Sequence, residues 1–227
     1  MRYLMLLLLT VPLLSACVGA DPSVVAVLVA DGGSADRALD AEVFAEEVER
    51  VCEGCTVEVH DAGGDAAEQQ RQFDEVVEAG VGGVVVEPVS PEVAEEFVLA
   101  AEGIPFVAAG TLVPGADWFV GTSAPVSGVE YASSLEAARA LVAGDVQEVV
   151  HVPIAEISRG AADVVVHAMV RTPLEGAQEF EGVPSWLHEP QTLTTKNLTS
   201  VLVATGLVSL DEVCAGQVNR CARLGLQ

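Results

Sequence analysis

The chain has 227 residues, of which 51% are hydrophobic, and a mean hydropathy of +0.44, so it can bury a sizeable core. Only 4% of the residues are aromatic, and the core must therefore consist mainly of Ala, Val and Leu. Thirty-four acidic residues oppose ten basic ones, with Lys196 the sole lysine, and the net charge of −24 excludes a nucleic-acid partner.

The N-terminal segment has the pattern of an export signal. Arg2 precedes the apolar run YLMLLLLTVPLL, which is too short to span a bilayer with margin. The run ends in LSAC at Cys17, which resembles the lipobox of bacterial lipoproteins. The resemblance implies a signal peptide at residues 1–16, a lipidated Cys17 and a tether at residues 17–22. An ordinary secretory signal with a chance cysteine is the alternative. Both place the mature chain outside the cytoplasm, and the lipid would hold it at the membrane surface.

Strand and helix patterns alternate from residue 23 to residue 128. The Val-rich run Ser23–Ala30 predicts a strand buried on both faces. A polar loop, Asp31–Asp36, and a helix with Val43, Phe44, Val48 and Val51 inward come next. The following elements are a strand at Thr56–His60, a helix at Ala66–Ala79, a strand at residues 81–88, a helix at residues 91–101 with Ser90 as N-cap, and strands at residues 104–109 and 117–121. This order predicts an α/β fold with a doubly wound parallel sheet.

Ligands of such sheets bind outside the carboxyl ends of the strands. The loops there are residues 31–36, 60–65, 87–90, 110–115 and 121–127. The loop HDAGGD at His60–Asp65 carries two acids and matches neither the dinucleotide nor the P-loop glycine pattern. We therefore expect a tight turn in which Asp65 caps the next helix, and not a phosphate cradle.

The pattern is less regular after residue 128. Helical periodicity covers Glu130–Val142 and Ile154–Val170, and strand-like runs cover residues 146–152 and Val183–Leu187. A short helix is predicted at Asn197–Thr205. We expect this C-terminal third to pack back as a partial lobe and to add strands or helices to the first sheet.

Apart from Cys17, the cysteines form two local pairs, Cys52/Cys55 and Cys214/Cys221. Local pairs in an oxidising compartment predict disulfides. A redox CxxC motif is the alternative for the first pair, but it follows a helical pattern and does not begin one, so no helix dipole lowers the thiol pKa. A four-cysteine zinc site is a further alternative, but the second pair lacks the usual tight spacing.

No catalytic motif is present. The sequence contains no H-E-x-x-H, G-x-S-x-G or P-loop, and His60, His151, His167 and His188 are scattered. No stretch has the carboxylate spacing of an EF-hand loop. We expect no enzyme, no cofactor and no metal site. An extracytoplasmic hydrolase would need a nucleophile–base pair that the sequence does not reveal.

Several segments resemble the D-xylose-binding branch of the periplasmic binding protein type I family, the sugar receptors of bacterial ABC importers. The similar segments are DAGGDAAEQQRQFDEVVEAGVGGVVVEPVSPE with the preceding CEGC, EGIPFVAAG, DWFVG, LEAARALVAG, HVPIAEISRGAADVVVHAM, VPSWLHEPQTLTTKNL and LVSLDEVCAGQVNRC. The resemblance covers most of the mature chain and is most specific in the C-terminal tail. It implies a sugar-binding first lobe at residues 23–128 and, at residues 129–227, the remnant of a second lobe with the tail.

The chain departs from that family in two ways. The match jumps from Gly128 to about Leu135, so most of the second lobe's sheet is expected to be missing. The family's sugar-contacting residues are also replaced. Gly110-Thr111 occupies the position of an Asp-Arg pair in the family, and Ser123-Ala124 occupies the position of an Asp-Asn pair. Ala35 occupies the position of an arginine. Each lost charge-assisted hydrogen bond costs about 1.5–3 kcal/mol.

Two functions follow as hypotheses. The first is an extracytoplasmic, lipid-anchored solute-binding protein that takes a xylose-like monosaccharide and delivers it to an ABC-importer permease. Its candidate ligand-binding residues are Asp31, Ser34, Asp36, Glu87, Thr111 and Ser123. The second is a degenerate single-lobe relative without sugar binding, which acts as a scaffold or protein-interaction module.

Overall fold

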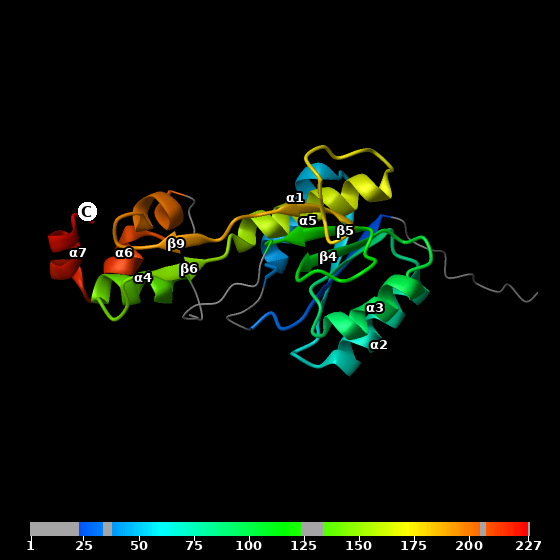
Figure 1. Ribbon diagram of the computed structural model, residues 1–227, viewed down its shortest axis with the longest axis horizontal. Helices are drawn as coiled ribbons and strands as arrows, with labels where there is room; N and C mark the ends of the chain where they lie inside the picture. Colours follow the sequence, from blue (N-terminus) through cyan, green and yellow to red (C-terminus); the bar gives the residue numbers. More distant parts are fainter. Residues whose placement is uncertain (1–22, 34–37, 124–133, 205–207, 227) are drawn as a thin grey trace, which may run out of the picture.

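The structure, a computed structural model, describes residues 23–33, 38–123, 134–204 and 208–226. These residues form two lobes joined by extended segments (Figure 1). Of the described residues, 23–33, 38–123 and 154–188 form the large lobe, and 134–151, 189–204 and 208–226 form the small lobe. The predicted sites Cys17, Ser34 and Asp36 lie outside the described residues.

A seven-stranded sheet in the order β2-β1-β3-β4-β5-β8-β7 forms the centre of the large lobe. Its strands, in chain order, are β1 (Val24–Val29), β2 (Thr56–Asp61), β3 (Gly83–Val86), β4 (Phe106–Gly110), β5 (Trp118–Gly121), β7 (Gln178–Phe180) and β8 (Val183–Leu187). Neighbouring strands are parallel except β7, which pairs antiparallel to β8. The predicted doubly wound α/β architecture is confirmed.

Helices cover both faces of this sheet (Figure 1). Helices α1 (Ala41–Val51) and α5 (Ile154–Met169) pack on one face, and α2 (Ala66–Ala79) and α3 (Pro91–Ala100) pack on the other. Every residue of β1 is buried because it lies between both layers, as its unbroken apolar run predicts. On the α2/α3 face, the rings of Phe73 and Phe97 stack with centroids 4.6 Å apart.

The helix α5 approaches the sheet closely. A Cβ added at Gly83 would lie 2.6 Å from Cγ2 of Val165, so only glycine fits beneath this helix. The first turn of α5 is also tied to the start of α1. The buried hydroxyl of Ser158 accepts a hydrogen bond from the Asp40 amide at 2.8 Å and donates to the carbonyl of Ile154 at 2.8 Å. Therefore α5 is an integral part of the large lobe although it follows residue 128.

Capping residues fix the helix starts where the sequence predicts them. The side chain of Asp65 accepts hydrogen bonds from the Ala67 and Glu68 amides, and Gly80 ends α2 in the left-handed conformation. Ser90 caps α3 with Pro91 in its first turn. The HDAGGD loop is thus a capped turn.

The small lobe has its own core. It comprises α4 (Ser134–Ala143), a two-stranded antiparallel sheet of β6 (Val149–His151) and β9 (Gln191–Leu193), a π-helix η1 (Thr199–Val203), and the short helices α6 (Leu210–Cys214) and α7 (Val218–Leu224). Leu141, Leu193, Leu198 and Leu202 are the largest of its buried side chains. Both predicted disulfides are present, Cys52–Cys55 at the end of α1 and Cys214–Cys221 between α6 and α7.

The part after residue 128 divides between the lobes. As expected, it adds α5, β8 and β7 to the large sheet, while the rest builds the small lobe. The short helix expected at residues 197–205 is a π-helix of residues 199–203, and β7, β9, α6 and α7 were not predicted. Within the described ranges, no helix has the length and apolarity needed to cross a bilayer.

Candidate ligand site at the carboxyl ends of the strands

The carboxyl ends of five neighbouring parallel strands form one edge of the large sheet. The register aligns Leu28 with Val86, Val86 with Ala108, and Gly110 with Gly121, which in turn pairs with Leu187. The chain after β8 runs directly to β9 of the small lobe, so this edge faces the small lobe (Figure 1). The residues that follow the strands therefore lie on the side of the large lobe that is directed toward the small lobe.

Three of the predicted ligand residues lie on this edge and are at least partly exposed. Asp31 follows β1 and is partly exposed, and one of its carboxylate oxygens accepts a hydrogen bond from the Gly33 amide at 3.0 Å. Thr111 follows β4, Ser123 follows β5, and both are exposed. The row of one carboxylate and two hydroxyls matches the donors and acceptors of a polyol.

Glu87 follows β3 and is only 6% exposed. Its carboxylate accepts hydrogen bonds from the amides of Ala38 and of Ala30, the latter at 3.4 Å. Glu87 therefore ties the loop after β1 to the end of β3. Gln69 of α2 extends this support, since its side chain donates to the Glu87 carbonyl at 2.8 Å and accepts from the Val89 amide at 2.9 Å. The structure thus gives Glu87 a positioning role at the edge where the sequence predicts a ligand contact.

Asp61 belongs to the same edge and was not among the predicted residues. It ends β2, and one carboxylate oxygen accepts from the amides of Gly63 at 2.9 Å and Gly32 at 3.3 Å. It therefore joins the loops after β1 and β2. The only sequence signal was its position directly after the predicted strand Thr56–His60, because its hydrogen-bond partners come from two loops.

Two histidines and one acid flank the connections between the lobes. His151 ends β6, His188 follows β8 and donates its backbone amide to the Gly121 carbonyl at 2.8 Å, and Glu156 lies in the first turn of α5. Burial lowers the pKa of both imidazoles, and the nearby Glu156 carboxylate opposes this effect. Both rings are therefore neutral at neutral pH and can donate and accept hydrogen bonds. One Glu156 oxygen is buried without a partner among the described residues.

A cavity of about 330 Å³ adjoins this edge at His188. It lies between α5 and β8, and Trp186, Asp163 and Glu175 are among its lining residues. The indole of Trp186 donates to the Glu175 carbonyl at 3.1 Å. The cavity is thus beside the row of strand ends and not within it. No group of three or more His, Cys, Asp or Glu residues suited to a metal ion occurs in the described parts of the chain.

The architecture is that of a periplasmic-binding-protein-like α/β lobe with a reduced second lobe. The chain is similar to a carbohydrate transporter solute-binding protein from Chloroflexus aurantiacus in complex with D-glucose, with a TM-score of 0.66, 11% identity and coverage of 84% of this chain and 97% of the other. It is also similar to an ABC transporter solute-binding protein from Clostridium phytofermentans with bound β-D-glucose, with a TM-score of 0.64 and 10% identity. That match covers 84% of this chain and 99% of the other. A third neighbour is an ABC transporter solute-binding protein from Bacillus halodurans with bound myo-inositol, with a TM-score of 0.60 and 12% identity. That match covers 80% of this chain and 98% of the other.

These three neighbours are solute-binding proteins. No protein-family model matches the sequence, and no curated protein matches it significantly. The identities are low, so the comparisons establish the fold, and the activity has to be argued from the site.

Proposed function

We propose that the protein is an extracytoplasmic solute-binding protein of the sugar-importer type, which binds a monosaccharide or related polyol at the carboxyl ends of the large sheet. The row formed by Asp31, Thr111 and Ser123, on an edge that faces a second lobe, carries this proposal. Glucose and inositol bound to proteins of the same architecture support it.

The binding chemistry would rest on hydroxyl groups. Asp31 can accept from sugar hydroxyls through its second carboxylate oxygen, and Thr111 and Ser123 can both donate and accept. The small lobe would exclude water from the other side, as a site for a small ligand requires. The neutral rings of His151 and His188 would serve as additional partners at the connections between the lobes.

The proposal includes the finer points that the sequence suggests. A lipid on Cys17 would tether the mature chain to the membrane, Ser34 and Asp36 would contribute from the loop after β1, and an ABC-importer permease would receive the ligand. A xylose-like pentose is the first sugar to test because the C-terminal segments VPSWLHEPQTLTTKNL and LVSLDEVCAGQVNRC resemble that branch of the family.

Thermal unfolding of the chain from residue 18 onward, in the presence of pentoses, hexoses and sugar alcohols, tests the proposal. A ligand at about 100 times its Kd adds about 2.7 kcal/mol of stability, which raises Tm by roughly 5–10 °C in a protein of this size. A rise with one sugar and not with its epimers would identify the ligand.

Matched variants locate the site. Asp31→Asn should weaken binding roughly ten- to a hundredfold because a charge-assisted hydrogen bond is lost. Thr111→Val should weaken it less, since its hydroxyl bonds are neutral. Asp145→Asn and Thr199→Val are controls, because both residues are exposed on the small lobe. A cooperative transition that no sugar moves would contradict the proposal and would favour the scaffold or protein-interaction alternative.

A further inference from the structure

The small lobe carries a groove whose charge is opposite to that of the protein as a whole. Its volume is about 820 Å³, and it lies on α4, α7 and the segment after β9. We call it the basic groove. It is lined by Lys196, Arg220 and Arg223 around the apolar residues Leu141, Val142 and Leu224. None of these residues belongs to the strand ends of the proposed sugar site.

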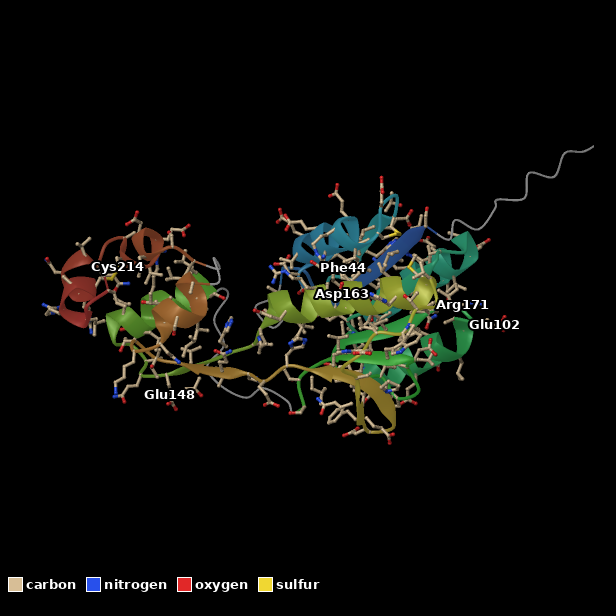
Figure 2. All side chains as sticks on the ribbon, turned by 90° about the horizontal axis from the view of Figure 1, so that it is seen from above. Phe44, Glu102, Glu148, Asp163, Arg171 and Cys214 are labelled. Atoms are coloured by element: carbon tan, nitrogen blue, oxygen red, sulfur yellow. A yellow bond between two sulfur atoms is a disulfide. The ribbon has the colours of Figure 1, made fainter. Side chains whose placement is uncertain are left out.

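The charge of the small lobe is unusual within this chain. Residues 134–151 and 189–226 contain four basic and six acidic residues, a net charge of −2, whereas the whole chain carries −24. Three of those four basic residues line the groove, and Glu148 is its one acidic lining residue among those described. Figure 2 shows Glu148 on the small lobe, on the opposite side of it from Cys214.

The cations of the groove are not neutralised by carboxylates within the described chain. In the large lobe, Arg50 pairs with Glu47, and Arg71 pairs with Glu68 and Glu75. No described carboxylate lies within 4.0 Å of any of the three cations of the groove. A basic cluster without a carboxylate partner in the described part of such an acidic chain is suited to an external anionic partner.

Helix stabilisation accounts for only part of this cluster. A Cβ added at Gly144 would lie 2.4 Å from the Arg220 guanidinium, so that side chain lies beside the carboxyl end of α4, where a cation is favourable. Arg223 lies in the last turn of the short helix α7. These two interactions with helix ends explain neither the third cation, which is Lys196, nor the apolar floor of the groove.

The helix that carries the arginines of the groove is held by a covalent link. Cys221 lies between them on α7, is 2% exposed and forms the disulfide to Cys214 at the end of α6. The link holds the backbone of α7 against the small-lobe core, so the segments from which the Arg220 and Arg223 side chains extend are in place before any partner binds. Such preorganisation lowers the entropic cost of binding.

We propose that the basic groove binds an acidic, amphipathic segment of a partner protein. All three cations are exposed, so a small anion would keep most of its hydration, whereas a peptide can contact the cations and the apolar floor together. Arg220 and Arg223 suit carboxylates because their guanidinium groups bind them in bidentate fashion. The apolar floor suits leucine-like side chains between the acids.

A labelled peptide tests this surface. We expect a fluorescein-labelled peptide of alternating Glu and Leu residues to bind the chain from residue 18 onward at low salt, and more weakly in about 150 mM NaCl. The variants Lys196→Gln, Arg220→Gln and Arg223→Gln should each weaken binding about two- to fivefold, and the triple variant more than tenfold. Arg159→Gln and Arg171→Gln on the large lobe are matched controls that should leave the affinity unchanged.

The outcomes separate this proposal from its competitors and from the sugar site. Equal losses in the controls, or no peptide binding at low salt, would overturn it. The proposal would also be overturned if the protein bound vesicles of anionic phospholipid and not the peptide, and if the triple variant lost this vesicle binding. Self-association of the wild type that the same substitutions remove would reassign the groove to a second copy of this chain. An unchanged Tm of each variant shows that folding is intact, and an unchanged sugar response shows that the two sites are independent.

Discussion

Gly110 lies where the end of β4 meets the loop after β1. Its φ is +73°, a conformation that L-residues adopt at a cost of roughly 1–2 kcal/mol. A Cβ added there would lie 2.1 Å from Cβ of Ala38, far inside the usual carbon–carbon contact of about 3.5–4.0 Å. Ala38 is also the residue whose amide binds Glu87, so this contact positions the loop that carries Asp31.

Replacement of Gly110 by alanine should therefore cost two separate quantities of free energy. Backbone strain accounts for about 1–2 kcal/mol, and the overlap with Ala38 adds about 1–3 kcal/mol. Gly103→Ala is the matched control, because Gly103 has φ +92° and no heavy atom within 4 Å of the added Cβ. It should lose only the strain energy.

Urea unfolding of four proteins measures the two terms. The proteins are Gly110→Ala, Gly103→Ala, Ala38→Gly and the double variant Ala38→Gly/Gly110→Ala. The double variant should recover the overlap energy, which appears as a coupling of about 1–3 kcal/mol in the double-mutant cycle. If Gly110→Ala costs no more than Gly103→Ala, or if the cycle shows no coupling, the close approach of this loop to β4 is refuted.

Two further predictions concern the contacts that join α5 and the small lobe to the sheet. Ser158→Ala should cost about 1–3 kcal/mol in urea unfolding because it leaves the Asp40 amide without its acceptor, whereas the exposed Ser200→Ala should stay within about 0.5 kcal/mol; equal costs would refute the link. Burial lowers the folded-state pKa of His151 and His188 below 6.5, so the unfolded state binds more protons, and stability should fall as pH drops from about 7.5 to 5.5. A variant with glutamine at both positions should show a flatter profile in this window, and an unchanged slope would contradict the assignment.

The first half of the fold could be predicted because its signals are local. The ends of α2 and α3 followed from Asp65 and from Ser90 with Pro91, since a cap and its helix are neighbours in the sequence. Both disulfides followed for the same reason, because the cysteines of each pair are close along the chain. The helices α6 and α7 were missed because five and seven residues are too short for a helical period to stand out.

The site was less predictable because its roles depend on contacts between distant loops. The sequence places Glu87 at the end of a strand. Its role in supporting a loop depends on the hydrogen bond that it accepts from Ala38, which is 49 residues away in the sequence. The exposure of Thr111 and Ser123 follows from the strand ends alone and could be expected. The basic groove was not predicted, since Lys196 and Arg220 are separated in sequence and line one groove only because α7 packs in the small lobe.

Segments from the later part of the chain complete the large sheet. Helix α5 covers one face of β3 and β4, and β8 pairs with the far edge of β5. Both elements follow α4 and β6 of the small lobe in the sequence. The large lobe therefore folds fully only when the later segments return. Folding thus brings His151, Glu156 and His188 to the connections between the lobes, because each lies within three residues of a point where the chain passes from one lobe to the other. A ligand bound at the strand ends would lie beside these connections, so any movement of the small lobe toward it would act on a few extended residues and leave both cores intact.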